Sequence, residues 1–267
     1  MIPPRPDWHA YELPHLAPPP APPPATTIQV LHERAKTLLE AENSLYSATH
    51  LTKSSDRRFL SAIMTSGTLT DKISALTLIC QESPLHTMKT LEALLGLARK
   101  KSRSQAVSSM GAIKDLFGPG TLLPPDRKLK LFSKQPGLGA KGCTDQHLIV
   151  WAYEDWLKGL YFQILTTLEA LCLDQLPFAR TNAVGYVWEL LKEKPEQEAN
   201  LLRLLVNKLV SLCLPTASRL TLVLGRYRQK GSLEGFISPT SIAEQPSRHE
   251  EHNYKFHRVR SGISSWK

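Results

Sequence analysis

Residues 26–210 consist of successive stretches in which apolar side chains recur every three or four positions. This spacing is typical of amphipathic helices, because residues three and four apart lie on the same side of an α-helix. Nowhere does the region alternate apolar and polar residues for long enough to predict a strand. The sequence therefore predicts an all-α fold.

Capping residues, glycines and prolines place the helix ends. The longest helix is expected over residues 145–173, with Trp156 in its buried stripe. The first is expected from Thr26, with its apolar stripe at Ile28, Leu31, Ala35, Leu38, Ala41 and Leu45. Others are expected before Gly67, from an N-cap at Thr70, from an N-cap at Ser83 to Arg99, up to Gly118, around 127–132, over 177–194, and from Pro195 to about Val210.

Helices of this length, joined by short links and apolar on one stripe, favour helix pairs stacked as a solenoid. We therefore expect a HEAT/armadillo-like helical-repeat domain over residues 26–211. The spacing Asp174-x-x-Pro177-x-x-Arg180-x-x-Ala183 resembles the turn of a HEAT repeat. A compact helical bundle is the alternative, because no clean sequence repeat is visible.

The two flanking segments have a different composition. Residues 1–25 contain Pro18–Pro20 and Pro22–Pro24, which predicts a Pro-rich, disordered or extended arm outside the core. Trp8 could anchor this arm in a partner's groove. Residues 212–267 predict a mostly disordered basic tail.

Composition excludes several classes of protein. An apolar content of 42% is enough for a core. The sequence has neither a long uncharged apolar run nor a secretion-type leader, so we expect a soluble intracellular protein without a membrane partner. Four cysteines without a C-x-x-C pair predict ordinary thiols rather than disulfides or a zinc site.

Positive charge is concentrated in one block. Residues 53–142 carry 15 Lys and Arg against 6 Asp and Glu, within a chain of net charge +9. Such a block creates a positive potential suited to phosphate backbones or acidic partners. A solvated basic surface without a specific partner is the alternative.

The basic residues cluster at expected helix ends, where a stacked repeat could align them along one edge. Folded RNA would be held there mainly by contacts to its phosphates and shape. The candidate RNA-binding residues are Arg57, Arg58, Arg99, Lys100, Lys101, Arg103, Arg127, Lys128 and Lys130.

Motifs that carry chemistry are absent or lack their context. The run from Gly137 to Gly142 fits G-x-G-x-x-G, but Ser133–Pro136 precede it instead of a buried strand, so we expect a flexible loop. Glu154 and Asp155 are adjacent and point to different faces of their helix, so we expect surface charges or partners of Lys158. We therefore expect no enzyme, no catalytic residue, no cofactor, no metal and no small-molecule substrate.

Several long stretches resemble the amino-terminal part of proteins of the CCAAT-binding-factor family. They cover roughly residues 28–209, and are far more specific than any short motif above. The main stretches are Ser54–Leu60, Gly67–Leu78, Gln81–His86, Lys100–Arg103, Leu123–Leu129, Tyr153–Lys158, Glu189–Glu198 and Asn200–Leu209.

This resemblance implies a nucleolar assembly factor for the large ribosomal subunit. Its implied partners are pre-ribosomal RNA, a nucleolar-complex protein and other large-subunit assembly factors, with localisation in the nucleus and nucleolus. The alternative is a helical-repeat protein adaptor, with a transcription-related role and no RNA contact. No catalytic residue carries over from the family under either hypothesis.

The resemblance stops at about Leu209, whereas the family's helical repeats continue. If the last helix lacks a covering neighbour, its apolar side should be partly exposed at Leu201, Leu204, Leu205 and Leu209. On this basis the isolated chain is expected to self-associate or to be unstable.

Overall fold

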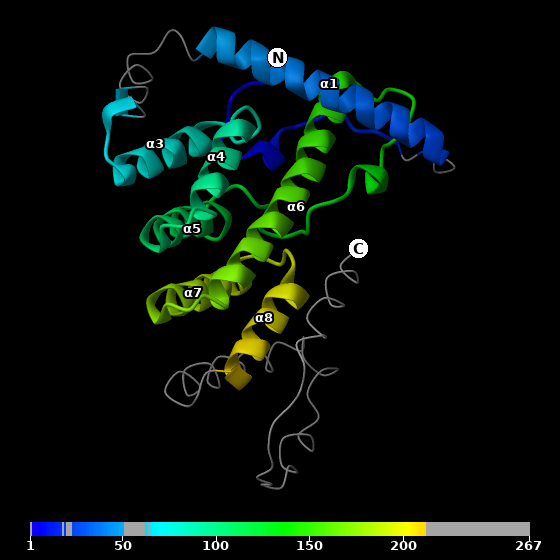
Figure 1. Ribbon diagram of the computed structural model, residues 1–267. Coiled ribbons are helices and arrows are strands. Elements are labelled where there is room, and N and C mark those ends of the chain that lie inside the picture. The colour runs from blue at the N-terminus through cyan, green and yellow to red at the C-terminus, as the bar shows by residue number, and fades with distance from the viewer. Residues whose placement is uncertain (1, 18, 20–22, 51–61, 64, 212–267) are drawn as a thin grey trace, which may run out of the picture. The chain divides into compact units, whose positions relative to one another are not determined.

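The computed structural model describes residues 2–17, 19, 23–50, 62, 63 and 65–211 of the chain (Figure 1). The described helices belong to one compact unit, Met1–Leu212, which we call unit 1. The predicted tail over 212–267 and the start of the helix expected before Gly67 lie outside the described residues. The described secondary structure is entirely helical, without a strand, so the all-α prediction is confirmed.

Seven α-helices and two short 3-10 turns make up the described part of unit 1. The bounds of the longest helix, α6, follow the sequence prediction closely. The elements are η1 (Trp8–Ala10), α1 (Ala25–His50), α3 (Leu69–Glu82), α4 (Met88–Ala98), α5 (Arg103–Phe117), η2 (Phe132–Lys134), α6 (Asp145–Cys172), α7 (Pro177–Glu193) and α8 (Glu198–Ser211).

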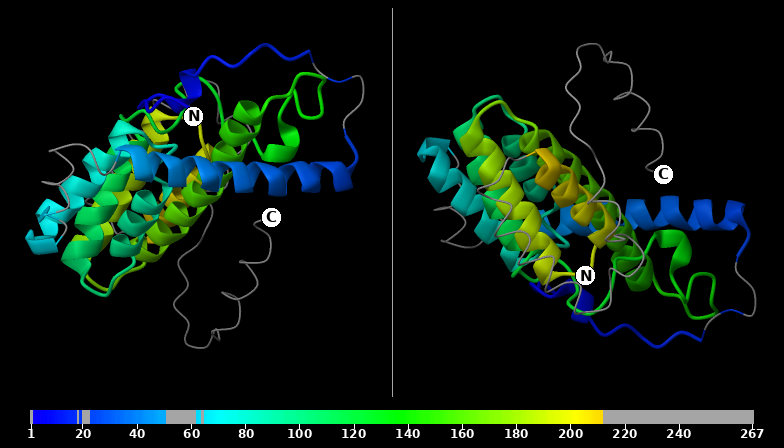
Figure 2. Two further views of the ribbon diagram at one scale, coloured as in Figure 1. Left: turned by 90° about the horizontal axis from the view of Figure 1, so that it is seen from above. Right: turned by 90° about the horizontal axis from the view of Figure 1, so that it is seen from below.

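Helix α6 packs against α1, α4, α7, α8 and η2 (Figures 1 and 2). Helix α1 crosses one end of it and makes the most extensive contact between two helices. Helices α3, α4 and α5 pack on one another, α5 packs on α7, and α7 contacts both α6 and α8. This succession of neighbouring helices is compatible with a helical-repeat solenoid.

Three helix starts differ from the prediction, and side-chain hydrogen bonds account for two of them. Thr68, rather than Thr70, caps α3 and forms a capping box with Asp71. Helix α4 begins after Thr87, because Ser83 instead forms a turn in which its hydroxyl lies 2.6 Å from Nδ1 of His86. Helix α8 begins at Glu198, after a turn that follows Pro195.

The buried face of α1 is rotated from the predicted stripe. Leu45 is 47% exposed, while Leu39, Glu42 and Tyr46 are buried. Polar and aromatic contacts explain the rotation: Glu42 accepts a hydrogen bond from the backbone N–H of Ile2, and the ring of Tyr46 stacks on His86 at 4.4 Å between centroids. Hydrophobic periodicity alone cannot reveal either contact.

The amino-terminal arm is part of the core, which corrects the expectation that it lies outside. Ile2 is 3% exposed and Trp8 is 2% exposed. The indole Nε1–H of Trp8 donates to the carbonyl oxygen of Leu122 at 2.9 Å, and its ring packs edge-on against Tyr153 at 5.1 Å between centroids. A buried aromatic ring with its polar atom satisfied is a strong anchor.

The arm continues along α6 after Trp8. Nε2–H of His147 donates to the carbonyl oxygen of Pro14 at 2.9 Å. Leu16 lies so close to Gly137 that a Cβ on this glycine would stand 2.7 Å from the leucine Cδ1. The backbone of residues 137–142 therefore serves as packing surface for the arm.

Two expectations about burial are also corrected. Trp156 is only half-buried, and its Nε1–H donates to Glu92 at 3.3 Å, whereas the neighbouring Tyr153 is completely buried. On α8, Leu201, Leu204 and Leu205 are buried at 0–3% exposure. Side-chain burial of Leu209 lies outside the described residues. The proposed reason for self-association therefore does not hold for the three described leucines.

We predict that Trp8→Ala lowers the free energy of unfolding by about 3–5 kcal/mol, since it leaves a cavity and an unpaired carbonyl at Leu122. Urea unfolding followed by circular dichroism would measure the loss. Tyr11→Ala, in the same arm but at a half-buried ring, serves as the control and should cost clearly less. Equal and small losses in both variants would show that the arm does not contribute to the core.

Candidate nucleic-acid interface

The turn between α4 and α5 carries the densest group of predicted RNA-binding residues. Arg99 caps the C-terminus of α4, and Arg103 is the first residue of α5. Cations at a helix C-terminus are stabilised by the partial negative charge of the last carbonyl groups. The local fold therefore favours positive charge at Arg99 without any ligand, whereas Arg103, at the N-terminus of α5, depends on its ion pair with Asp174.

Two arginines fix this turn to neighbouring helices. Nε–H of Arg99 donates to Oγ1 of Thr167 at 3.3 Å, and its Nη2–H donates to Oε1 of Gln163 at 3.0 Å. Arg103 forms an ion pair with Asp174, whose side chain is 8% exposed. Both guanidinium groups are therefore anchored, and their first role is to hold the turn in place.

Lys100 and Lys101 lie between these arginines and are exposed. Within the part of the chain that the structure describes, neither ammonium group has an ion-pair partner. Their charge is therefore available to an external anion. Because the backbone on both sides is fixed by Arg99 and Arg103, these two lysines are presented from a defined position.

A hollow of ≈ 390 Å³ lies beside this turn and brings together residues from α4, α5 and α6, which we call the arginine groove. Its wall combines guanidinium and ammonium groups with threonine hydroxyls and one carboxylate. The lining residues are Ala98, Arg99, Lys100, Arg103, Thr166, Thr167, Ala170, Leu171 and Asp174. The guanidinium and ammonium groups suit a phosphate backbone, which needs hydrogen-bond donors and positive charge rather than base-specific contacts. The hydroxyls of Thr166 and Thr167 already donate to backbone carbonyls of α6.

The helix expected around residues 127–132 is absent, and side-chain carboxylates explain why. The backbone N–H of Leu129 donates to Glu196 at 2.6 Å, and that of Lys130 donates to Glu154 at 2.8 Å. The backbone N–H of Phe132 donates to Asp155 at 2.9 Å. Backbone groups bound to distant carboxylates cannot form an intrahelical ladder.

Glu154 is the central acceptor of this arrangement and is 2% exposed, which corrects the expectation of a surface charge. It pairs with Arg127 and also accepts a hydrogen bond from Nε2–H of Gln135 at 2.9 Å. Lys158 does have an acidic partner, but it is Glu196, at 2.9 Å. Buried carboxylates with several donors are typical of structural networks.

The remaining basic residues of this segment are only partly free. Lys128 approaches Glu198 at 3.6 Å. Arg127 is engaged by Glu154, as described above. The side chain of Lys130 is exposed and has no ion-pair partner within the described ranges.

The two basic groups do not share one face of α6. Glu154, which holds residues 127–130, and Gln163, which holds Arg99, are nine positions apart on the helix. That separation corresponds to roughly 14 Å along the axis and about half a turn around it. Figure 1 shows the same relation, with α4 and α5 on one side of α6 and the chain that leads into η2 on the other. Arg57 and Arg58 lie outside the described residues.

Sequence reasoning identified the cations of the arginine groove but not its second wall. Gln163, Thr166 and Thr167 carry no charge and belong to a helix more than sixty residues away along the chain. No sequence signal marks them, because a serine or threonine on a helix surface is common. Only the packing of α4 against α6 brings them to the cations.

Other candidate chemistry is located in ordinary structural settings. The run from Gly137 to Gly142 is an irregular loop between η2 and α6, with positive φ at Gly139 and Gly142. Over the ranges described, no group of three His, Cys, Asp or Glu side chains is arranged to hold a metal ion. None of the described helices is long and apolar enough to cross a membrane.

The three described cysteines are free thiols. Burial raises the pKa of Cys80 to about 12 and that of Cys172 to about 11, since a thiolate would lose its hydration there. Cys143 is half-buried, and burial raises its pKa as well. These environments make the thiols poor nucleophiles at neutral pH.

Comparison with known proteins places this helical unit in a family. The chain is 49% identical over 232 residues to ribosome biogenesis protein NOC1 of Chaetomium thermophilum, covering 78% of this chain. It is 36% identical over 197 residues to CCAAT/enhancer-binding protein zeta of Mus musculus, covering 70% of this chain. It belongs to the CCAAT-binding-factor family.

A more distant member is nucleolar complex protein 1 of Drosophila melanogaster, 27% identical over 209 residues, or 75% of this chain. No family model matches the chain. The chain spans only about a fifth of the length of these relatives: 22% of the Chaetomium protein, 19% of the mouse protein and 17% of the Drosophila protein.

Three of the stretches that carry the family resemblance meet in the structure. Arg127 and Leu129 come from the stretch Leu123–Leu129, Glu154 and Lys158 come from Tyr153–Lys158, and Glu196 comes from Glu189–Glu198. Their contacts are the buried carboxylate network that fixes residues 127–132. In this family member, the three stretches therefore contribute to one structural network.

We predict that Glu154→Ala lowers the free energy of unfolding by about 2–4 kcal/mol, because Arg127, Gln135 and the backbone N–H of Lys130 lose their acceptor. Hydrogen exchange should show faster exchange at the Lys130 amide. Glu33→Ala removes an exposed ion pair with Lys36 and should change stability far less, because solvent screens this pair. Equal effects of the two substitutions would contradict the structural role of Glu154.

Proposed function

We propose that this chain takes part in ribosome biogenesis in the nucleolus, as a scaffold rather than a catalyst. The names of its relatives, a ribosome biogenesis protein and a nucleolar complex protein, support this role. The described residues supply a rigid helical unit with an open basic groove. Scaffolding requires such a surface and does not require converging catalytic side chains.

Within this role, the arginine groove is the proposed contact for pre-ribosomal RNA. The observation that carries the proposal is that Lys100 and Lys101 are exposed and have no ion-pair partner among the described residues, while two anchored arginines hold their turn in place. The hydroxyls of Thr166 and Thr167 on the opposite wall already donate to backbone carbonyls of α6, so the ammonium groups supply the donors for phosphate oxygens. The groove lacks aromatic side chains for base stacking, so we expect recognition of the phosphate backbone and RNA shape.

Residues 127–130 contribute less under this proposal. Arg127 is committed to Glu154, and Lys128 lies near Glu198, so mainly Lys130 remains for RNA. Their position on another face of α6 makes them a separate contact at most. Arg57 and Arg58 remain candidates on their sequence alone.

Other large-subunit assembly factors, including a nucleolar-complex protein, are the proposed protein partners. The name of the Drosophila relative supports membership in such a complex. The alternative function, a protein adaptor without RNA contact, would use the same basic surface for acidic partners.

We predict that Lys100→Glu combined with Lys101→Glu weakens binding of a large-subunit precursor RNA fragment about 10–100-fold at moderate salt. The dependence of log affinity on log salt should also become shallower by about one to two units, since each lysine that contacts a phosphate contributes to that slope. Fluorescence anisotropy over a salt series, with the full chain, would measure both quantities.

Lys141→Glu is the matched control, because Lys141 is exposed and lies in the loop before α6. It should change affinity by no more than about twofold, through net charge alone. If the double variant and the control bind RNA equally well, the arginine groove is not the RNA contact and the adaptor function gains support. Both substituted lysines are exposed, so unchanged circular dichroism is expected.

A further inference from the structure

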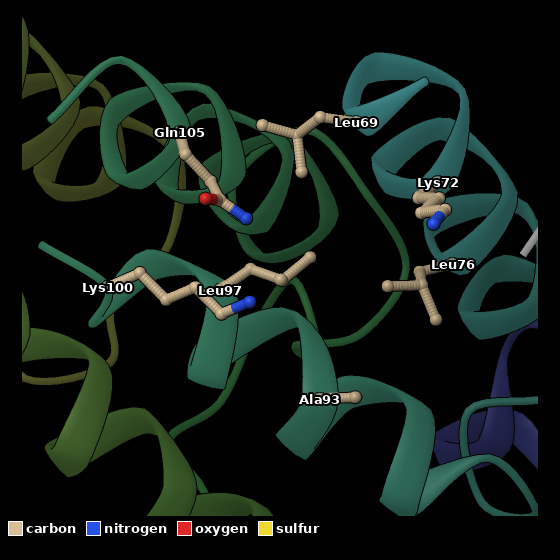
Figure 3. A pocket seen from close by; sticks show the side chains of 7 residues that line it. All are labelled: Leu69, Lys72, Leu76, Ala93, Leu97, Lys100 and Gln105. Atoms are coloured by element: carbon tan, nitrogen blue, oxygen red, sulfur yellow. The ribbon is translucent and has the colours of Figure 1, made fainter. Parts of the chain in front are cut away.

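A second hollow lies between α3, α4 and the start of α5 (Figure 3). Its volume is ≈ 300 Å³. We call it the leucine hollow, since three of its seven lining residues are leucines. The lining residues are Leu69, Lys72, Leu76, Ala93, Leu97, Lys100 and Gln105.

The sequence spacing explains how two helices build this hollow. Leu69, Lys72 and Leu76 are three and four positions apart, so they share one face of α3. Ala93, Leu97 and Lys100 follow the same spacing along α4 and its C-terminal turn. The two faces stand opposite each other, as Figure 3 shows, and leave an apolar space between them.

The rim of the hollow is cationic. Lys72 and Lys100 lie at opposite sides of it in Figure 3, and no acidic residue is among the lining side chains. Lys72 is partly exposed and Lys100 is fully so. In the described portion of the chain neither has an ion-pair partner. The floor is apolar: Leu69 is 38% exposed, while Leu76 is buried.

This combination differs from what a nucleic acid requires. Unstacked bases bind to aromatic rings or to the planar face of arginine, and the leucine hollow offers neither. Its polar groups are one amide, Gln105, and two ammonium groups on the rim. An aliphatic floor between two positive charges instead complements an aliphatic side chain between two negative charges.

We propose that the leucine hollow is a docking site for an acidic peptide segment of a partner protein, with a leucine-sized anchor flanked by carboxylates. The anchor occupies the space between Leu69, Leu76 and Leu97. The flanking carboxylates pair with Lys72 on one side and Lys100 on the other. Lys100 also lines the arginine groove, so the two sites are neighbours, whereas Lys72 belongs to the leucine hollow alone.

The test uses the full chain and a short fluorescein-labelled peptide in which leucines are flanked on both sides by glutamates. Fluorescence anisotropy should show saturable binding. Replacing the glutamates by glutamine, or the leucines by serine, should weaken it strongly. Equal binding of the serine peptide would reduce the interaction to nonspecific charge and overturn the proposal.

Two substitutions in the protein separate charge from shape. Lys72→Glu replaces an attraction by a repulsion at the rim and should weaken peptide binding about tenfold. Ala93→Phe, at an exposed position, should fill the hollow and abolish peptide binding without a change in charge. Lys141→Glu, remote from both hollows in sequence and not part of either lining, should leave peptide affinity within about twofold.

RNA binding by the same variants distinguishes this inference from the proposed function. Lys72→Glu and Ala93→Phe should leave RNA affinity within about twofold of the unchanged chain. Loss of RNA binding in both, together with no peptide binding by the unchanged chain, would assign the leucine hollow to the nucleic-acid surface instead. Failure of RNA binding in the unchanged chain would refute the arginine groove and leave the peptide result unaffected.

Discussion

The structure depends on how the long helix α6 is covered. Seventeen of its residues are buried, on several sides of the helix, and other helices cover only part of that surface. Irregular chain covers the rest, namely the amino-terminal arm and the segment that leads into η2. Irregular backbone can be buried only if its N–H and C=O groups find partners. Side chains of α6 itself provide several of these partners: Glu154, Asp155 and His147.

This constraint separates what the sequence could predict from what it could not. Periodicity predicted α6 to within a residue or two and located α5 and α7 well, because their apolar stripes pack on other helices. The helix predicted for residues 127–132 is absent because Glu154 and Glu196 compete for the backbone N–H groups. The arm around Trp8, which its prolines placed outside the core, is buried. Each error involves a polar contact between residues far apart in the sequence, which local patterns cannot encode.

The candidate site shows the same division. Charge alone selected the cations, but it could not distinguish Arg103, which is committed to Asp174, from Lys101, which is exposed and unpaired among the described residues. It also suggested a single basic edge, whereas the helical phase of α6 separates Arg99 from residues 127–130. The uncharged residues that line the two hollows, such as Thr167 and Leu76, are brought together by helix packing. Tertiary structure thus turns a diffuse positive block into two neighbouring surfaces of different chemistry.

The packing of the arm also has a consequence for the order of folding. Trp8 forms a hydrogen bond with Leu122, 114 positions later, and Pro14 forms one with His147, 133 positions later. Contacts of such long sequence separation form slowly, because a large loop must close first. During synthesis at about 5–20 residues per second, the indole of Trp8 would wait several seconds before its acceptor exists. Until that point the indole of Trp8 remains exposed to solvent.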